Sequence, residues 1–149
     1  MAVEIVRRGA GKRFPSRKFL QIANEILTIL KLNESELSLA LIGNREMQRL
    51  NGRFRHKDYP TDVLSFPAED QLAGEVRLLG DVVISVEKAR EQAKDRGRSL
   101  DEEMVTLMIH GILHLIGYDH ERSPRNAQIM GRAERKIHRQ LCDRGFLQV

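Results

Sequence analysis

The sequence predicts an α+β fold in which four strands pack with about five helices, and we expect residues 1–149 to form a single domain. Four short apolar segments are bounded by turn-forming residues, as strands are. Five longer segments carry apolar residues at helical spacing. The two kinds of segment do not strictly alternate, which favours an α+β fold over a doubly wound parallel sheet.

The N-terminal part of the chain is expected to hold two of the strands and the first helix. Residues 2–6 alternate weakly between apolar and polar side chains and predict a short strand. Residues 16–30 place apolar side chains at helical spacing and predict an amphipathic helix. Residues 37–42 are apolar, lie between polar turns and predict the second strand.

The middle of the chain is expected to supply a short helix and two more strands. Asn44 is placed to cap the short helix. Residues 62–66 predict a strand that Pro67 closes. Residues 81–86 (DVVISV) predict the fourth strand, and their consecutive β-branched apolar residues indicate a central, buried position.

The last third of the chain is predicted to be helical. One helix is expected over residues 87–94. Ser99 begins the sequence SLDE, which has the form of a capping box, and predicts a helix that ends at Gly117. The Ser-Pro pair at residues 123–124 is a typical helix start and predicts a closing helix that ends at Gly145.

Composition points to a cytoplasmic protein with a basic surface. The lone cysteine, Cys142, excludes an intramolecular disulfide and is expected to be an apolar filler. We expect neither a signal peptide nor a membrane span, because no apolar run is long enough. The formal charge is +4, with basic residues concentrated in 7–18, 45–57 and 122–144. These segments would suit a polyanion such as RNA, or they are solvated helix faces.

A histidine-rich segment at residues 110–120, HGILHLIGYDH, predicts a metal site. His110 and His114 lie four residues apart in a predicted helix, so their side chains project from one face. Gly117 can adopt the positive φ that reverses the chain and returns His120 as a third ligand. Three imidazoles leave a fourth tetrahedral position open, as in catalytic zinc sites. We therefore expect these three histidines to bind one zinc ion.

The spacing HxxxHxxGxxH is similar to the metzincin protease motif but lacks its general base. Those proteases have Glu directly after the first His, where this chain has Gly111. Peptide hydrolysis is therefore disfavoured, although zinc can activate water without that Glu. Asp119 can orient a histidine ring or act as a base, or it is a solvent-facing turn residue. His56 and His138 lie among basic residues and are expected to face solvent.

A second segment, residues 51–67 (NGRFRHKDYPTDVLSFP), concentrates cations just before a predicted strand. The cations are Arg53, Arg55 and Lys57. Arginine presents a planar fork of donors that suits phosphate and can stabilise charge that develops on a phosphoryl group. From composition alone, an ordinary charged surface loop is the alternative.

These segments together resemble the YbeY family of bacterial endoribonucleases. The resemblance rests on residues 110–120, on residues 51–67 and on LGDVVIS at residues 79–85, in the same order and spacing. It covers nearly the whole chain from about residue 37 onward, and the HxxxHxxGxDH and TDVLSFP blocks are its most specific parts.

Membership of this family would imply more than the spacing does. It implies a zincin-like α+β fold with a small mixed sheet, zinc bound by His110, His114 and His120, and a role for Arg55 in activity. It implies action on single-stranded RNA in small-subunit rRNA maturation and ribosome quality control. It also links Asp81 to a small-subunit ribosomal protein; from the sequence alone, Asp81 could equally cap a strand or support a metal ligand.

We therefore predict zinc-dependent cleavage of RNA, with Arg55 and Asp119 as catalytic candidates and Arg53, Lys57 and Asp81 as candidates for binding RNA or a partner. Activation of water and activation of the ribose 2′-OH both remain open. A rival hypothesis is a non-catalytic ribosome-assembly factor with structural zinc. The open three-His site disfavours that rival, whereas the missing Glu favours it. A hydrolase of small molecules is a further alternative.

Overall fold

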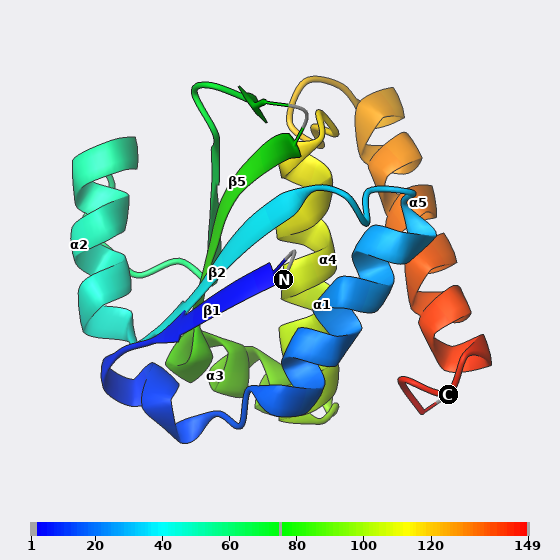
Figure 1. The fold of residues 1–149 in the computed structure, drawn as a ribbon. Helices are drawn as coiled ribbons and strands as arrows, with labels where there is room; N and C mark the ends of the chain where they lie inside the picture. Colours follow the sequence, from blue (N-terminus) through cyan, green and yellow to red (C-terminus); the bar gives the residue numbers. More distant parts are fainter. Residues whose placement is uncertain (1–2, 75, 149) are drawn as a thin grey trace.

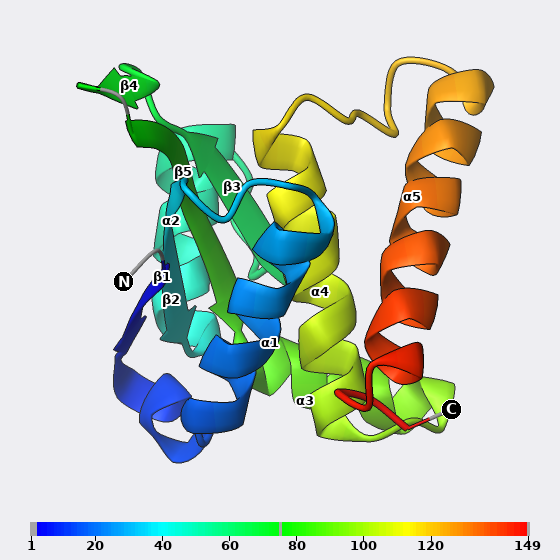
Figure 2. The ribbon, with the colours of Figure 1, turned by 45° about the vertical axis from the view of Figure 1, so that its right-hand side comes forward.

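The computed structural model describes residues 3–74 and 76–148 (Figures 1 and 2). In chain order the elements are β1 (Val3–Arg7), the 3₁₀ helix η1 (Gly9–Arg13), α1 (Arg17–Ile29), β2 (Glu36–Ile42), α2 (Asn44–Arg55), β3 (Val63–Pro67), β4 (Leu72–Ala73), β5 (Val76–Ser85), α3 (Val86–Arg96), α4 (Leu100–Leu115) and α5 (Pro124–Asp143).

A mixed sheet with the strand order β1-β2-β5-β3 forms the centre of the molecule. β1, β2 and β5 run parallel, and β3 runs antiparallel to β5. The short β4 forms a hairpin with the start of β5. The described residues form four main strands and five α-helices, which confirms the predicted α+β fold class.

The two faces of the sheet carry different layers of helices. α1 and α4 cover one face, and α2 lies on the other (Figures 1 and 2). Because successive strand residues point to opposite faces, Val82 and Ile84 of β5 belong to the large core under α1 and α4. Val83 packs with Met47 of α2 in a smaller second cluster. The sheet edge beside β3 lies next to α4, which positions the site described below.

α4 is enclosed by the sheet and by α1, α3 and α5. Its start confirms the predicted cap, because the Ser99 hydroxyl accepts a hydrogen bond of 3.1 Å from the Glu102 N–H. Glu103 is fully buried, and its charge is balanced by Arg96 at 2.8 Å and Arg98 at 3.0 Å.

None of the helices in the described ranges combines the length and apolar character needed to cross a membrane.

Asn44 does not cap α2, contrary to the prediction. Gly43 occupies the cap position, and the Asn44 N–H donates to the carboxylate of Glu87 at 2.8 Å. The Asn44 side chain instead accepts a 2.7 Å hydrogen bond from the Ser85 hydroxyl. A residue more than forty positions away therefore satisfies the helix start, and no local sequence pattern encodes that contact.

β5 begins five residues before the strand predicted at 81–86. Gly80 allows this extension, because its φ is +128° and a Cβ there would lie 2.2 Å from the Phe66 carbonyl oxygen. Asp81 consequently lies within the central strand and does not open it. The 3₁₀ helix and β4 were not predicted, and the other boundaries differ by one or two residues, a normal difference.

Several residues of the predicted basic segments form tertiary contacts. Arg7 donates a 2.9 Å hydrogen bond to the Phe14 carbonyl. Arg8 forms an ion pair of 2.6 Å with Glu46, whose hydrogen bond raises the pKa of the guanidinium. Part of the basic composition is therefore paired within the protein.

Candidate metal centre and cleft

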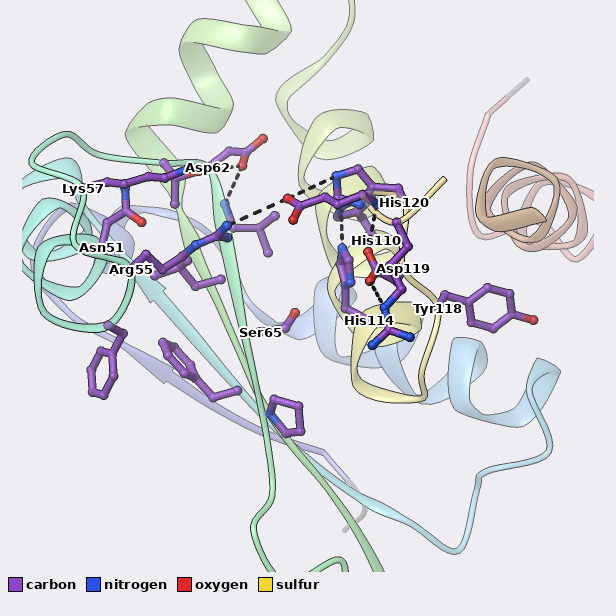
Figure 3. A pocket seen from close by; sticks show the side chains of 18 of the residues that line it. Asn51, Arg55, Lys57, Asp62, Ser65, His110, His114, Tyr118, Asp119 and His120 are labelled. Atoms are coloured by element: carbon purple, nitrogen blue, oxygen red, sulfur yellow. Dashed lines mark hydrogen bonds and ion pairs between the residues drawn. The ribbon is translucent and has the colours of Figure 1, made fainter. Parts of the chain in front are cut away.

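The three histidines of the 110–120 segment lie together. His110 and His114 project from the C-terminal half of α4, and His120 comes from the loop after it (Figure 3). The Nε2 atoms of His110 and His114 are 3.2 Å apart. One ring nitrogen from each of the three residues lies within 4.8 Å of the others. Spacing along the chain thus correctly indicated which side chains would meet.

The chain reverses after α4 as the glycine predicted. Gly117 has a φ of +106°, a conformation that L side chains rarely adopt. Its N–H donates to the His114 carbonyl at 3.1 Å, and the Tyr118 N–H donates to the Leu113 carbonyl at 3.0 Å. These bonds satisfy the end of the helix and fix the path that returns His120 to the cluster.

The donor set fits a divalent transition metal. Neutral imidazoles bind zinc and its neighbours, and three of them leave a tetrahedral ion one position for water or substrate. Burial lowers the pKa of His114, and the neighbouring His110 and His120 lower it further. Asp119 and a backbone hydrogen bond with Tyr118 act in the opposite direction. The net effect favours the neutral ring, which is the form that binds a metal.

Gly111 faces the sheet, so the position after His110 has no room for the metzincin Glu. A Cβ at Gly111 would lie 2.6 Å from Val82 Cγ1 of β5. The hydroxyl of Ser65 in β3 donates a 2.9 Å hydrogen bond to the Gly111 carbonyl. The close approach of α4 to the sheet therefore accounts for the glycine and for the absence of a general base at this position.

We expect Gly111→Ala to destabilise the protein. Overpacking against the β-branched, buried Val82 costs about 1–3 kcal/mol, more than the gain of up to about 1 kcal/mol from replacing a helical glycine. The free energy of urea unfolding measures the difference. Gly52→Ala in α2 is the matched control, since a Cβ there would meet its nearest neighbour at an ordinary 3.7 Å. This variant should therefore gain stability. Equal gains in both variants would contradict the packing described here.

A cleft of about 900 Å³ opens beside the histidine cluster. Its walls are the end of α2, the loop that follows, β3, the C-terminal half of α4 and the loop at residues 117–122. Arg55 faces the cluster across the cleft (Figure 3). Its Nη2 atom lies 3.9 Å from Glu121 Oε1, which lies 3.9 Å from His120 Nε2. An acidic side chain thus occupies the space between the arginine and the histidines.

The charges that line the cleft are balanced. Three cationic and three anionic side chains line it: Arg55, Lys57, Arg122, Asp62, Asp119 and Glu121. Their formal charges cancel, so the cleft without a metal has little net attraction for an anion. A divalent ion at the histidines would make the cleft cationic next to Arg55.

The other predicted site residues are divided between the cleft and the rest of the surface. Lys57 and Asp119 line the cleft together with Arg55. Arg53 lies outside the lining, and its guanidinium carbon is 5.3 Å from the centre of the Phe54 ring. Asp81 is exposed and lines a second groove on the α2 face of the sheet, which shares Phe54 and Phe66 with the cleft. The structure therefore does not bring Asp81 near the histidines.

Asp119 has the contacts of a turn residue. Its carboxylate accepts a 2.8 Å hydrogen bond from the Glu121 N–H and lies 3.1 Å from Arg122 Nε. A role for this carboxylate in catalysis stays a prediction. His56 is exposed, as expected, and ends α2 in a left-handed conformation. His138 faces solvent only in part, because it is half-buried with Nδ1 3.8 Å from Cys142 Sγ.

Sequence reasoning missed two carboxylates beside the cluster. Glu121 follows His120 directly, and no spacing pattern distinguishes it from an ordinary charged loop residue. Glu134 in α5 lies 3.3 Å from His110 Nδ1, although the two residues are 24 positions apart. The helical spacing that identified the histidines carries no information about which residue of another helix lies behind them.

Comparison with known proteins supports the resemblance noted in the sequence. A family model described as endoribonuclease YbeY matches residues 8–142. A protein of Sulfurihydrogenibium named endoribonuclease YbeY is 46% identical over 127 residues, which are 85% of this chain and 84% of that protein. A Myxococcus xanthus protein of the same name is also 46% identical, and its match spans 95% of this chain but 47% of that protein.

A solved structure shares the fold. The solution structure of a Thermotoga maritima protein matches with a TM-score of 0.67 and 26% sequence identity. The match covers 95% of this chain and 90% of that chain.

Proposed function

Because the chain belongs to the endoribonuclease YbeY family, we propose that it is a zinc-dependent endoribonuclease that cleaves single-stranded RNA during small-subunit rRNA maturation and ribosome quality control. One observation carries the proposal: a cluster of three histidines faces an arginine across a cleft. The three candidate metal ligands and a phosphate-binding cation are therefore close enough to act on one phosphodiester.

His110, His114 and His120 would hold the zinc ion, and Arg55 would hold the scissile phosphate. A bound zinc ion supplies Lewis-acid stabilisation of a phosphate oxygen and lowers the pKa of a water molecule. The Arg55 guanidinium offers paired N–H donors to the phosphate. Glu121 is the present partner of Arg55 at 3.9 Å, and an incoming phosphate would replace it. Asp119, next to His120, is a candidate for accepting a proton from the nucleophile.

The balanced charge of the cleft makes RNA binding depend on the metal. We expect the metal-free protein to bind a single-stranded RNA oligonucleotide more weakly than the zinc-loaded protein does. Affinity for RNA should also fall steeply as salt rises, because Lys57 and Arg55 would displace counterions from the backbone. Titration of a labelled oligonucleotide at several salt concentrations, with and without zinc, measures both effects. Equal affinity in both forms would contradict this electrostatic account.

Exposed aromatic side chains beside the cations would bind the bases. Phe54 and Tyr59 line the cleft, and each is 53% exposed. The buried Asn51 donates a 2.8 Å hydrogen bond to the Tyr59 carbonyl and so holds that loop in place. Unpaired bases stack on aromatic rings, whereas bases within a duplex are not available. This arrangement supports a preference for single strands.

Tyr59→Ala is expected to weaken binding of single-stranded RNA by about 1–3 kcal/mol if one base stacks there. Tyr59→Phe keeps the ring and should retain most of the affinity, which makes it the matched control. Fluorescence anisotropy of a labelled oligonucleotide measures both variants. Equal losses in the two variants would assign the effect to the hydroxyl instead of the ring.

Asp81 would serve a protein contact on the other side of the sheet. It lines a groove together with exposed Val6 and half-buried Ala40, and this groove shares Phe54 and Phe66 with the histidine cleft. We propose that this groove meets a small-subunit ribosomal protein, with Arg53 nearby available to RNA. A partner at this groove would lie beside the cleft at Phe54 and would leave the histidines accessible to the RNA strand.

The rival function is a non-catalytic assembly factor with structural zinc. Among the described residues three histidines form the ligand group, whereas structural zinc usually has four protein ligands, and this disfavours the rival. The deciding experiment treats end-labelled single-stranded RNA with the protein after chelation and again after zinc is restored. The proposal predicts no cutting by the chelated protein and cutting after restoration. Binding without cutting in the zinc-loaded form would favour the assembly factor.

A further inference from the structure

Glu134 places a carboxylate behind one of the three histidines. It belongs to α5, which lies alongside α4 (Figure 2). Its Oε2 atom is 3.3 Å from His110 Nδ1, and the two side chains are 28% and 25% exposed. This contact joins the last helix of the fold to the candidate metal centre.

The two ring nitrogens of His110 have different surroundings. Nε2 faces His114 Nε2 at 3.2 Å, inside the cluster. Nδ1 faces Glu134. A carboxylate accepts hydrogen bonds, so Nδ1 carries the hydrogen and the lone pair of the neutral ring is on Nε2. The contact therefore selects the tautomer that presents Nε2 to the centre of the cluster.

We propose that Glu134 is a positioning residue that orients His110 toward the metal, an inference that rests on the proposed zinc site. A carboxylate on the far nitrogen of a ligating imidazole fixes the ring and raises its basicity. Glu134 thereby adds to metal affinity without touching the metal. The centre then depends on α5, although all three histidines lie before that helix.

The other two histidines are held differently. His114 has a backbone hydrogen bond with Tyr118. His120 lies on the loop, is 42% exposed and is 3.9 Å from the carboxylate of Glu121. Glu134 is thus nearer to its histidine than Glu121 is, and it comes from a helix instead of a turn. Of the two carboxylates, Glu134 has the better geometry for orienting a ring.

The competing explanation for this contact is an ordinary structural ion pair between two helices. A partly exposed pair of this kind contributes little to stability. If the contact were only structural, its removal would leave metal affinity and the environment of the metal unchanged. Metal binding and the spectrum of the bound metal therefore distinguish a positioning role from a structural one.

The test compares Glu134→Ala and Glu134→Gln with the parent protein. Glu102→Gln is the control, because Glu102 lines the same groove between α4 and α5, and among the described residues its side chain forms no ion pair with the histidine cluster. Competition with a chromophoric chelator gives the affinity for Zn²⁺. Co²⁺ loading gives a visible spectrum that reports the ligand geometry, and thermal unfolding of the metal-free proteins reports the fold.

Glu134→Ala should bind Zn²⁺ about 10–100-fold more weakly and shift the Co²⁺ spectrum, with little change in metal-free stability. Glu134→Gln should lie between Glu134→Ala and the parent, because its amide oxygen still accepts from Nδ1. Parental affinity and spectrum in both variants would overturn the positioning role and leave the zinc site standing. A parent protein that binds neither ion would overturn the zinc site and this inference together.

Discussion

Replacing His114 with Ala is expected to remove the metal and RNA cleavage together. His114 is the middle histidine of the three, and burial lowers its pKa so that the neutral ring is favoured. Two imidazoles, one of them on an exposed loop, do not hold zinc firmly. Metal content after dialysis and the cleavage rate of single-stranded RNA measure the two losses, and both should fall to the level of the chelated protein.

His56→Ala is the matched control for that experiment. His56 is exposed at the end of α2 and is not part of the cluster, so metal content and cleavage should stay at parental values. Circular dichroism of both variants verifies the fold. A His114→Ala protein that keeps its zinc and cuts at the parental rate would exclude His114 as a ligand.

Replacing Arg55 with Ala is expected to leave the zinc in place and slow cleavage by about 10²–10³-fold. Arg55 lies across the cleft from the histidines and reaches His120 only through Glu121, so its loss removes no metal ligand. Removal of one donor to a charge that develops in the transition state has an effect of this size. Single-turnover cleavage rates and zinc content are measured on the same preparation.

Arg55→Lys separates charge from geometry. Lysine keeps the positive charge but lacks the planar fork that binds two phosphate oxygens. Its rate should lie between those of the parent and Arg55→Ala. Loss of zinc from Arg55→Ala would instead show that Arg55 supports the metal centre, and an unchanged rate would remove Arg55 from the mechanism.

The histidine cluster could be predicted from the sequence because its geometry is local. The turn of the helix sets the relation of His110 to His114, and the backbone freedom of Gly117 sets the return of His120. The main elements of the fold were likewise predictable from apolar spacing. Both kinds of pattern extend over a few residues and are readable without tertiary structure.

Features that depend on contacts between distant segments could not be predicted. Glu87 satisfies the start of α2 in place of the Asn44 side chain. Glu134 reaches His110 from another helix. The early start of β5 rests on the close approach of Gly80 to β3. In each case tertiary packing determines the partner residue, and the spacing of residues along the chain does not encode that packing.

Gly111 shows how the structure gives a reason for a pattern that the sequence only displayed. The sequence revealed that no Glu follows the first histidine. The structure adds that a Cβ at this position would lie too close to Val82 and Ser65 of the sheet. The absence of Glu is therefore tied to the packing of α4, and a proton acceptor for the reaction has to come from elsewhere in the cleft.

The most direct test of the proposed function is cleavage of small-subunit rRNA by the zinc-loaded protein. The Arg55→Ala variant, purified by the same procedure, is assayed beside it. The account predicts that the parent cuts the RNA and the variant is strongly impaired, and the chemistry of the product ends then identifies the nucleophile. Equal cutting by both proteins would indicate a contaminating nuclease. No cutting by either would contradict the endoribonuclease and favour the assembly factor.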